Sequence, residues 1–237
     1  MNIDIAIEPF FTQYEALSKA ADAIFEKVKQ EFPECVKCRI QCTDCCYALF
    51  DLSLIEAMYI NYRFNEAFEE QVKADVIEKA NRADRIIHKI KRQAHKDFEN
   101  GKKESDILAE VAKEKVRCPL LNSRNRCDLY ASRPITCRLY GIPTEIGGLG
   151  RTCGQSGFHP GRPYPTVHLD MIHQKMYELS ERFCASIKTR YAGLPELLVP
   201  LSMALLTNYN EEYLGIQTPE MDEDERASNY GQTLGRR

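Results

Sequence analysis

Hydrophobic residues recur at steps of three and four along most of the chain, which is the spacing of one buried face of an α-helix. These stripes predict helices at about residues 9–31, 53–64, 65–99, 105–115, 169–187 and 195–206. The stripe over 65–99 is the clearest, because no proline or glycine interrupts it before Gly101. A helix of that length would extend roughly 50 Å, so other helices could pack along it.

Local signals mark where several of these helices should begin and end. Pro33 is expected to end the first helix, and Pro195 suits the first position of the last one. Ser53-Leu54-Ile55-Glu56 has the form of a capping box, in which Ser53 and Glu56 would satisfy each other's backbone amides. The second helix should therefore start there.

Residues 117–165 have a different composition, with four cysteines, six prolines and the run Gly147-Gly148-Leu149-Gly150. We expect irregular chain with a short hairpin at about 141–151. A loop of this length is uncommon in a compact domain unless something else holds it. Ligand bonds to a metal would replace the missing regular structure. The expected fold class is therefore mainly α, a helical bundle with one long helix (about 65–99) and an irregular, metal-nucleated cysteine-rich segment (about 117–165).

Length and charge narrow the possibilities further. A chain of 237 residues can bury a core without disulfides, and we expect one domain over 1–215 with a polar, flexible tail over 216–237. A net charge of −3 gives no reason to expect nucleic acid. The N-terminus lacks the pattern of a secretory signal, and the apolar stretch 197–210 is short and contains Pro200. These features favour a cytoplasmic protein without a membrane span.

The ten cysteines are clustered rather than spread along the chain. Five lie in the window Cys35-x2-Cys38-x3-Cys42-x2-Cys45-Cys46. A second group follows about seventy residues later and contains Cys118, Cys127 and Cys137. In a reducing compartment such clusters indicate metal binding rather than disulfides. The alternative, that these are small buried hydrophobes, suits a single cysteine better than five in twelve residues.

The metal can be iron or zinc. A closed zinc site takes four ligands, and more candidates than that are clustered here. Cys45 and Cys46 are adjacent, so we expect their side chains to diverge and to serve different ions or different irons of one cluster. Neither group contains a histidine. This all-cysteine set favours an iron–sulfur cluster, of the 4Fe–4S type, with zinc as the alternative.

The two segments together resemble a known family. The pattern Cys38-x3-Cys42-x2-Cys45-Cys46, then Cys118-Pro119-Leu120-Leu121, then Cys127-x2-Tyr130-x2-Arg133-Pro134-x2-Cys137-Arg138-x-Tyr140-Gly141 is similar to that of the YkgJ-type bacterial cysteine-cluster family, a zinc- or iron-chelating domain. The resemblance covers about 35–46 and 117–141. It implies one metal site built from both segments, with these ligands: Cys38, Cys42, Cys45, Cys46, Cys118, Cys127 and Cys137. The same pattern also resembles the cluster region of flagellin lysine N-methylases.

The remaining cysteines and the nearby arginines are expected to differ in their roles. Cys35 and Cys153 are optional further ligands, which extends the site over 117–153 and allows a second metal. Cys184 lies in a predicted helix, and we expect it to pack in the core. Three arginines flank the ligands, and their charge would offset that of the thiolates. They are Arg117, Arg133 and Arg138. For Arg133 the alternative is a turn residue whose side chain pairs with a surface acid.

Three functions follow from these observations. The first is a protein with one or two iron–sulfur clusters that has a redox, electron-transfer or cluster-dependent role with a partner protein or partner enzyme. The second is a non-catalytic zinc protein in which the metal joins the two segments and the helices provide an interaction surface. A more remote third, implied only by the family resemblance, is an enzyme like a lysine N-methylase. The sequence identifies no catalytic residue, so it leaves open whether the protein is an enzyme.

Overall fold

The computed structural model describes residues 3–39, 41–159 and 161–216. The fold is mainly α, as predicted. Apart from Ile216, the expected tail over 216–237 lies outside the described residues. Within the described part of the chain, no helix is both long enough and apolar enough to cross a membrane.

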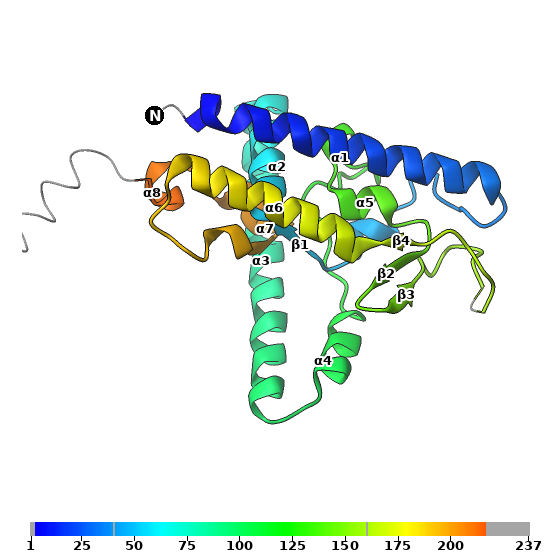
Figure 1. Ribbon diagram of the computed structural model, residues 1–237. Coiled ribbons are helices and arrows are strands. Elements are labelled where there is room, and N and C mark those ends of the chain that lie inside the picture. The colour runs from blue at the N-terminus through cyan, green and yellow to red at the C-terminus, as the bar shows by residue number, and fades with distance from the viewer. Residues whose placement is uncertain (1–2, 40, 160, 217–237) are drawn as a thin grey trace, which may run out of the picture.

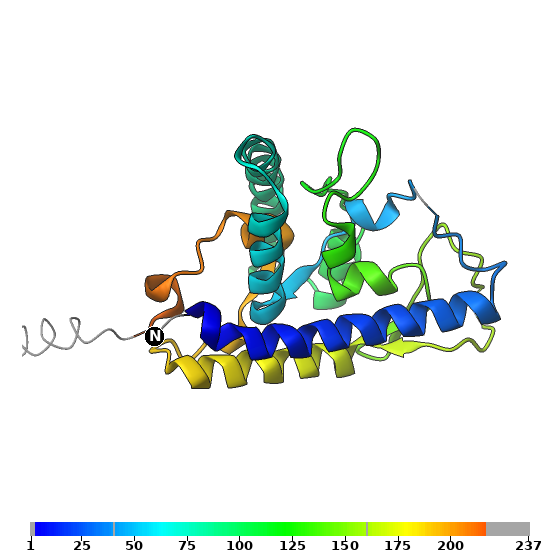
Figure 2. The same ribbon diagram turned by 90° about the horizontal axis from the view of Figure 1, so that it is seen from above.

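Two long helices lie side by side along one side of the molecule (Figure 1 and Figure 2). They are α1 (Ile3–Glu31) and α6 (Leu169–Ile187). The buried positions of α1 recur at three- and four-residue steps and include Phe11, Tyr14 and Ala21. The rings of Phe10 and Phe183 meet edge to face, with centroids 5.6 Å apart. Phe10 thus joins α1 to α6, while Phe11 and Tyr14 of the predicted stripe at 9–31 pack against Tyr59 of the helix that comes next after α1 in the chain.

The boundary between the second and third helices lies further along the chain than predicted. α2 (Leu54–Ala67) continues past the expected end, and α3 (Glu70–Glu99) begins five residues after the predicted start at 65. Phe68 and Glu69 between them have extended backbones. The Phe68 ring packs on Phe64 with centroids 5.4 Å apart. Phe68 has the spacing of the predicted third helix, but it lies between the two helices because its ring packs on Phe64.

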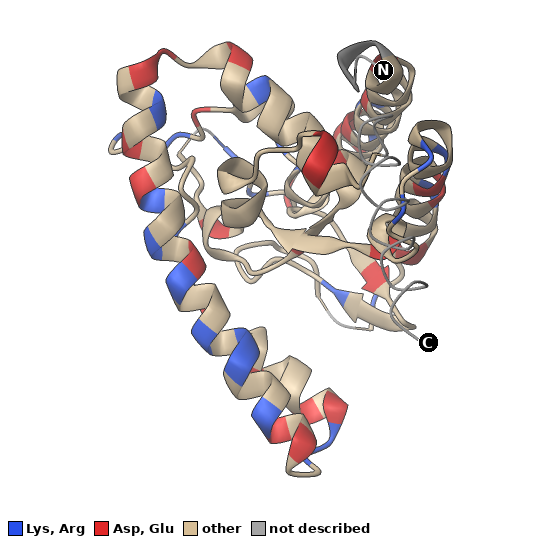
Figure 3. Cartoon of the chain, turned by 90° about the vertical axis from the view of Figure 1, so that its left-hand side faces the viewer, with Lys and Arg blue, Asp and Glu red and all other residues tan. Residues whose placement is uncertain are grey.

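The far end of α3 extends away from the α1–α6 pair and carries many charged side chains (Figure 3). α4 (Glu104–Val111) returns beside it after the turn at Gly101, whose φ is +80°. Lys102 joins the two helices through ion pairs with Asp97 at 3.3 Å and Glu110 at 2.6 Å.

The predicted last helix over 195–206 is wrong over 195–200, and only 201–206 is α-helical. The segment forms a 3₁₀ turn η3 (Leu194–Glu196), a strand β5 (Leu198–Pro200) and a short helix α7 (Leu201–Leu206), and α8 (Glu211–Leu214) follows. β5 pairs antiparallel with β1 (Asp51–Ser53), so that buried Val199 lies opposite buried Leu52. Pairing between distant segments therefore overrides the helical spacing of the leucines.

The cysteine-rich segments contain only short elements. η1 (Asp44–Tyr47) holds two cysteines, η2 (Tyr130–Ser132) follows Cys127, and α5 (Ile135–Leu139) carries Cys137. β2 (Thr144–Ile146) and β3 (Leu149–Arg151) form the expected hairpin, and β4 (Val167–His168) pairs with β2 in parallel. The hairpin turn uses Gly147 and Gly148, both at positive φ, which suits a two-residue turn.

Glu56 is buried, and it does not form the predicted capping box. The Ser53 side chain makes no capping hydrogen bond, and Glu56 is only 1 % exposed. Its Oε1 accepts from the hydroxyl of Tyr14 at 2.7 Å and from the amide of Ile135 at 2.9 Å. Glu56 therefore connects α1 and α2 to the first residue of α5, the helix that carries Cys137.

A second polar contact fixes α5 against α1. Arg138 is only 7 % exposed and forms an ion pair with Asp22, which also pairs with Arg133 at 3.1 Å. The remaining Arg138 donors reach the carbonyls of Arg133 at 2.9 Å and Ala131 at 2.7 Å. The chain on both sides of Cys137 is thus held by partly buried, charge-assisted hydrogen bonds.

Substitution of Glu56 tests its role as the acceptor for Tyr14 and Ile135. In Glu56→Ala, two buried donors lose their acceptor, and we expect the metal-free protein to lose about 2–4 kcal/mol of unfolding free energy. Glu56→Gln keeps an acceptor oxygen and should lose less. Urea unfolding at neutral pH measures both, and equal stability of Glu56→Ala and the wild type would contradict the proposed contact.

The same variants should differ in their pH dependence. Burial raises the pKa of Glu56 from its ordinary 4.5, so folding disfavours its ionised form. The wild type should therefore lose unfolding free energy relative to Glu56→Gln as the pH rises from 4.5 through the raised pKa. Parallel stability curves for the two proteins would show that Glu56 is not buried as an acid.

Candidate metal centre

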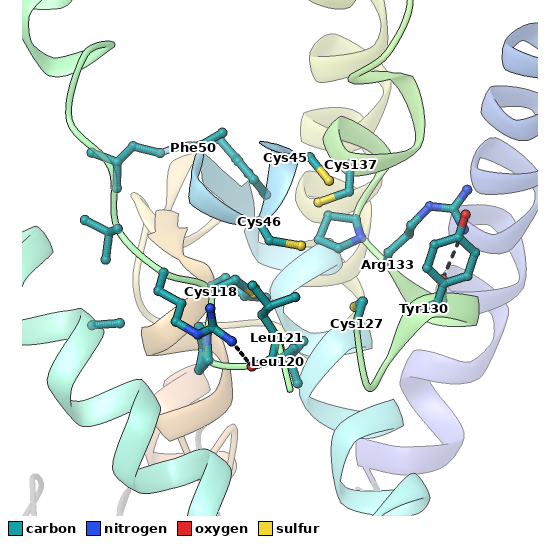
Figure 4. A pocket seen from close by; sticks show the side chains of 18 of the residues that line it. Cys45, Cys46, Phe50, Cys118, Leu120, Leu121, Cys127, Tyr130, Arg133 and Cys137 are labelled. Carbon is teal, nitrogen blue, oxygen red and sulfur yellow. Dashed lines mark hydrogen bonds between the residues drawn. The ribbon is translucent and has the colours of Figure 1, made fainter. Parts of the chain in front are cut away.

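A cavity of about 420 Å³ lies between the two cysteine segments (Figure 4). Six cysteines line it, together with apolar residues of α3 and α7 such as Ala83, Ile87 and Leu201. These cysteines are Cys42, Cys45, Cys46, Cys118, Cys127 and Cys137. Each of the six is partly exposed. The structure thus brings together residues of both sequence groups on one cavity.

A backbone contact joins the two segments at the cavity. The amide of Cys118 donates to the carbonyl of Cys46 at 2.8 Å, and the amide of Val116 donates to Tyr47 at 3.3 Å. The turn of η1 is closed by the amide of Cys46 on Thr43 at 2.9 Å. Cys46 and Cys118 are therefore neighbours because their own main chains pair.

Cys118 and Cys127 lie on opposite sides of a tight loop. Leu121 and Cys127 form an antiparallel bridge, and the amide of Asp128 donates to Leu120 at 2.8 Å. Burial raises the pKa of the Cys118 thiol to about 12, and the amides of Leu120 and Leu121 on its sulfur oppose the rise. Amides directed at a sulfur stabilise a thiolate and are a common feature around metal-bound cysteines.

Cys45 accepts hydrogen bonds from two other thiols. Those from Cys137 and then Cys46 hold the pKa of Cys45 well below its usual value, while burial opposes this. The same bonds, together with burial, raise the pKa values of Cys46 and Cys137, because donation requires their protons. The divergence of the Cys45 and Cys46 side chains stays a prediction. Figure 4 shows the Cys45 sulfur next to the Cys137 sulfur.

We call Cys45, Cys46, Cys118, Cys127 and Cys137 the inner group. Each of the last four has its pKa raised in part by the charge of Cys45, so the five sulfurs lie within electrostatic reach of one another. Burying several thiolates together is costly without a compensating cation.

Three other predicted ligands form a separate outer group, Cys38, Cys42 and Cys153. The Cys153 thiol donates to Oδ2 of Asp44 at 3.4 Å. Burial raises the pKa of Cys38 to about 11, and the charges of Cys42 and Cys153 contribute to the rise. Cys38 and Cys153 are not among the residues that line the cavity, whereas Cys42 lies at the boundary and lines it. Asp44 was not singled out from the sequence, although its position inside the cysteine window marks it.

The last two cysteines have packing contacts. Cys35 lies against the hydrophobic core, and its carbonyl accepts from the amide of Gly157 at 2.8 Å. Cys184 is 3 % exposed within α6, and burial alone raises its pKa to about 11. The prediction that Cys184 packs in the core is confirmed.

The flanking arginines differ in what they contact. Arg117 lines the cavity and donates to the hydroxyl of Tyr47 at 2.7 Å and to the carbonyl of Asn122 at 2.9 Å. Arg133 also lines it, lies over the Tyr130 ring at 4.1 Å and contributes to lowering the pKa of Cys45. Its pairing with Asp22 agrees with the alternative expectation of a turn residue held by an acid.

Arg138 has a different position from the one expected. It is absent from the described residues that line the cavity, and its side chain is directed at Asp22 on α1. Arg138 is adjacent to Cys137 in the short helix α5, and adjacent residues of a helix point in different directions. Cys137 meets the cavity, and its neighbour Arg138 anchors the helix.

The donor set fits a thiophilic metal, although the side chains are not yet in coordination positions. Among the described residues, no three histidine, cysteine, aspartate or glutamate side chains already stand as ligands of one ion. The inner sulfurs are instead engaged with one another and with backbone amides. A cysteine sulfur moves by rotation about a single bond. The chemistry of the donors, and amides placed to stabilise thiolates, therefore suit zinc or iron.

The fold and the cavity together define a mainly α-helical metal-binding protein. The model of the CxxCxxCC family, described as "Putative zinc- or iron-chelating domain", matches residues 35–154. This is just over half of the 237 residues, and the chain belongs to this family. No curated protein and no solved structure matches the chain. The matched range includes every predicted ligand and excludes Cys184.

A glycine next to Cys38 provides a test of this geometry. A Cβ at Gly141 would overlap the Cys38 sulfur and would meet the Phe25 ring at 3.2 Å. We expect Gly141→Ala to lose about 1–3 kcal/mol of unfolding free energy through overpacking. Gly154→Ala is the matched control, because nothing lies within 4 Å of its Cβ position. If both variants unfold at the same denaturant concentration, Cys38 does not lie against Gly141.

Proposed function

We propose that the inner group holds one iron–sulfur cluster and that the protein serves in electron transfer or in a cluster-dependent step with a partner protein. The observation that carries this proposal is the gathering of five thiols on one cavity. A closed zinc site takes four ligands, so one zinc ion leaves a buried thiol without a role. A cluster has several irons, which lets adjacent residues such as Cys45 and Cys46 bind different atoms of one group.

The surroundings of the cavity support a redox role. A bound cluster would accept and donate single electrons. Amides of Leu120 and Leu121 on the Cys118 sulfur, and the guanidinium of Arg133 near Cys45, stabilise negative charge there. Such donors and charges tune a cluster's reduction potential. The chain's own residues thus supply the electrostatic environment that such a cofactor requires.

The rim of the cavity favours an acidic partner. Four arginines line it, and no aspartate or glutamate is among the described lining residues. The arginines are Arg39, Arg117, Arg126 and Arg133. A partner that docks on this rim would lie next to the cavity that the six cysteines line. Complementary charge raises the rate of such encounters and makes them sensitive to salt.

Purification without oxygen tests the cofactor directly. We expect a brown protein with broad visible absorption and about four iron and four sulfide per chain. Cys118→Ser and Cys137→Ser should lose this absorption and most of the iron. Metal binding is coupled to folding in such sites, so both variants should also be less stable.

Cys184→Ala is the matched control, since it removes a cysteine outside the cavity and should keep the full iron content. A colourless wild-type protein that contains stoichiometric zinc would overturn the iron–sulfur proposal in favour of a zinc-stabilised interaction protein. Full iron content in both Cys118→Ser and Cys137→Ser would show that the inner group is not the site.

A further inference from the structure

We propose that the cavity also binds a small organic anion, which is apolar over most of its length and carries a carboxylate at one end. The inference rests on the proposed function only in treating this anion as the protein's substrate, because the residues that would bind it are not cysteines. The cavity volume of about 420 Å³ is typical of a small-molecule site. Two features of its lining, an apolar wall and an arginine without an acidic partner, define the ligand.

One wall of the cavity is apolar and comes from elements that carry no cysteine. Ala83 and Ile87 of α3 are 4 % and 9 % exposed, and with Val116 they form a small cluster separate from the main hydrophobic core. The wall is completed by four other apolar residues, which are Leu49, Phe50, Pro200 and Leu201. A hydrocarbon ligand that covers this wall removes both apolar surfaces from water.

Polar contacts hold this wall in place. The hydroxyl of Ser202, which is 1 % exposed, donates to Oδ1 of Asp84 at 3.2 Å and so fixes α7 against α3. Lys91 of α3 forms an ion pair with Asp51 of β1 at 2.7 Å. Asp51 in turn lies opposite Pro200 in the β1–β5 pair. The positions of α3, α7 and β5 are therefore fixed by these contacts, and the wall does not depend on a bound ligand.

The arginines of the lining supply the charge that the ligand must match. Two of the four already have partners, because Arg117 donates to the Tyr47 hydroxyl at 2.7 Å and Arg133 pairs with Asp22 at 3.1 Å. The side chain of Arg126 is exposed and has no hydrogen-bond or ion-pair partner among the described residues. A guanidinium matches the geometry of a carboxylate, which can accept two of its hydrogen bonds.

The wall and the arginine together select one class of ligand. An acidic peptide would pair with the arginines and leave the apolar wall uncovered. A neutral hydrocarbon would cover the wall and leave Arg126 without a partner. A short-chain fatty acid satisfies both, and it would compete with an acidic partner protein for the arginines at the rim. The geometry therefore points to an amphipathic monocarboxylate bound beside the inner group.

Titration calorimetry of the full-length protein with its metal bound tests this site, with octanoate as the probe. We expect saturable binding of about one octanoate per chain. Octan-1-ol has the same chain length without the charge, so it should bind at least about tenfold more weakly. Octylamine should bind more weakly still, because its positive charge would face the arginines.

Two variants test the two features separately. Ala83→Phe should lower octanoate affinity at least about tenfold, because its ring would occupy the space beside the wall. Ile86→Phe is the matched control, since Ile86 lies on the same helix, is 49 % exposed and does not line the cavity. Arg126→Gln should weaken octanoate and leave octan-1-ol unchanged. Arg124→Gln, which changes an exposed arginine outside the lining, should alter neither.

Four results would overturn the proposal. The first is no saturable octanoate binding by the wild type. The second is unchanged affinity in both Ala83→Phe and Arg126→Gln, which would place the octanoate elsewhere. The third is binding only after metal depletion, which would show that the metal and the anion occupy the same space. The fourth is binding of a hexaglutamate peptide without binding of octanoate, which would assign the arginines to a protein partner alone.

Failure of the proposed function is recognised separately, by its own measurements of colour and iron. If the protein is colourless and holds zinc, the iron–sulfur proposal fails. The same titrations on that zinc protein would still decide the anion site, because Ala83 and Arg126 are not metal ligands.

Discussion

The hydrogen bond from the Cys118 amide to the Cys46 carbonyl fixes the distance between two cysteine segments that are far apart in the sequence. With this bond, η1 lies beside the loop that carries Cys118 and Cys127, and cysteines of both segments line one cavity. Several thiols are then partly buried together, and burial raises the pKa of most of them. A positively charged metal group relieves this cost, because bound cysteines are deprotonated and their charge is neutralised.

The rest of the fold keeps this arrangement in place. Glu56 ties the start of α5 to α1 and α2, and Asp22 ties Arg138 to α1. Both contacts are buried or partly buried and polar, so they specify one position of the helix that carries Cys137 rather than a range of similar packings. The cavity is thus supported by α1 and α2, neither of which contributes a cysteine to it.

Much of the helical structure could be predicted from the sequence. The apolar stripes at 9–31 and 169–187 lie in α1 and α6, and the glycines after Ile146 form the turn of the predicted hairpin. Those features depend on residues that are close in sequence. The strand at Leu198–Pro200 could not be anticipated, because its partner, Asp51–Ser53, lies far away along the chain. Glu56 has the spacing of a capping box, yet it binds Tyr14 and Ile135 instead.

The spacing of the cysteines indicated a metal site, but not that the cysteines form an inner and an outer group. The spacing did not indicate that the Cys45 sulfur lies next to the Cys137 sulfur, which comes from the other segment. The separation of Cys38 and Cys153 from the cavity depends on how the loop at 153–157 folds back onto Cys35. Arg138 is adjacent to a cavity cysteine but faces α1. Each of these differences arises from side-chain direction, which sequence spacing alone does not determine.

Alkylation of the ten cysteines, followed by mass spectrometry with and without bound metal, tests the central claim most directly. The account predicts that metal protects Cys45 and Cys46 together with Cys118, Cys127 and Cys137, and that a chelator exposes all five at the same concentration. Cys184 should resist alkylation in both states while the protein stays folded, because it is buried in α6. Protection limited to the cysteines of one segment would contradict a site built across both.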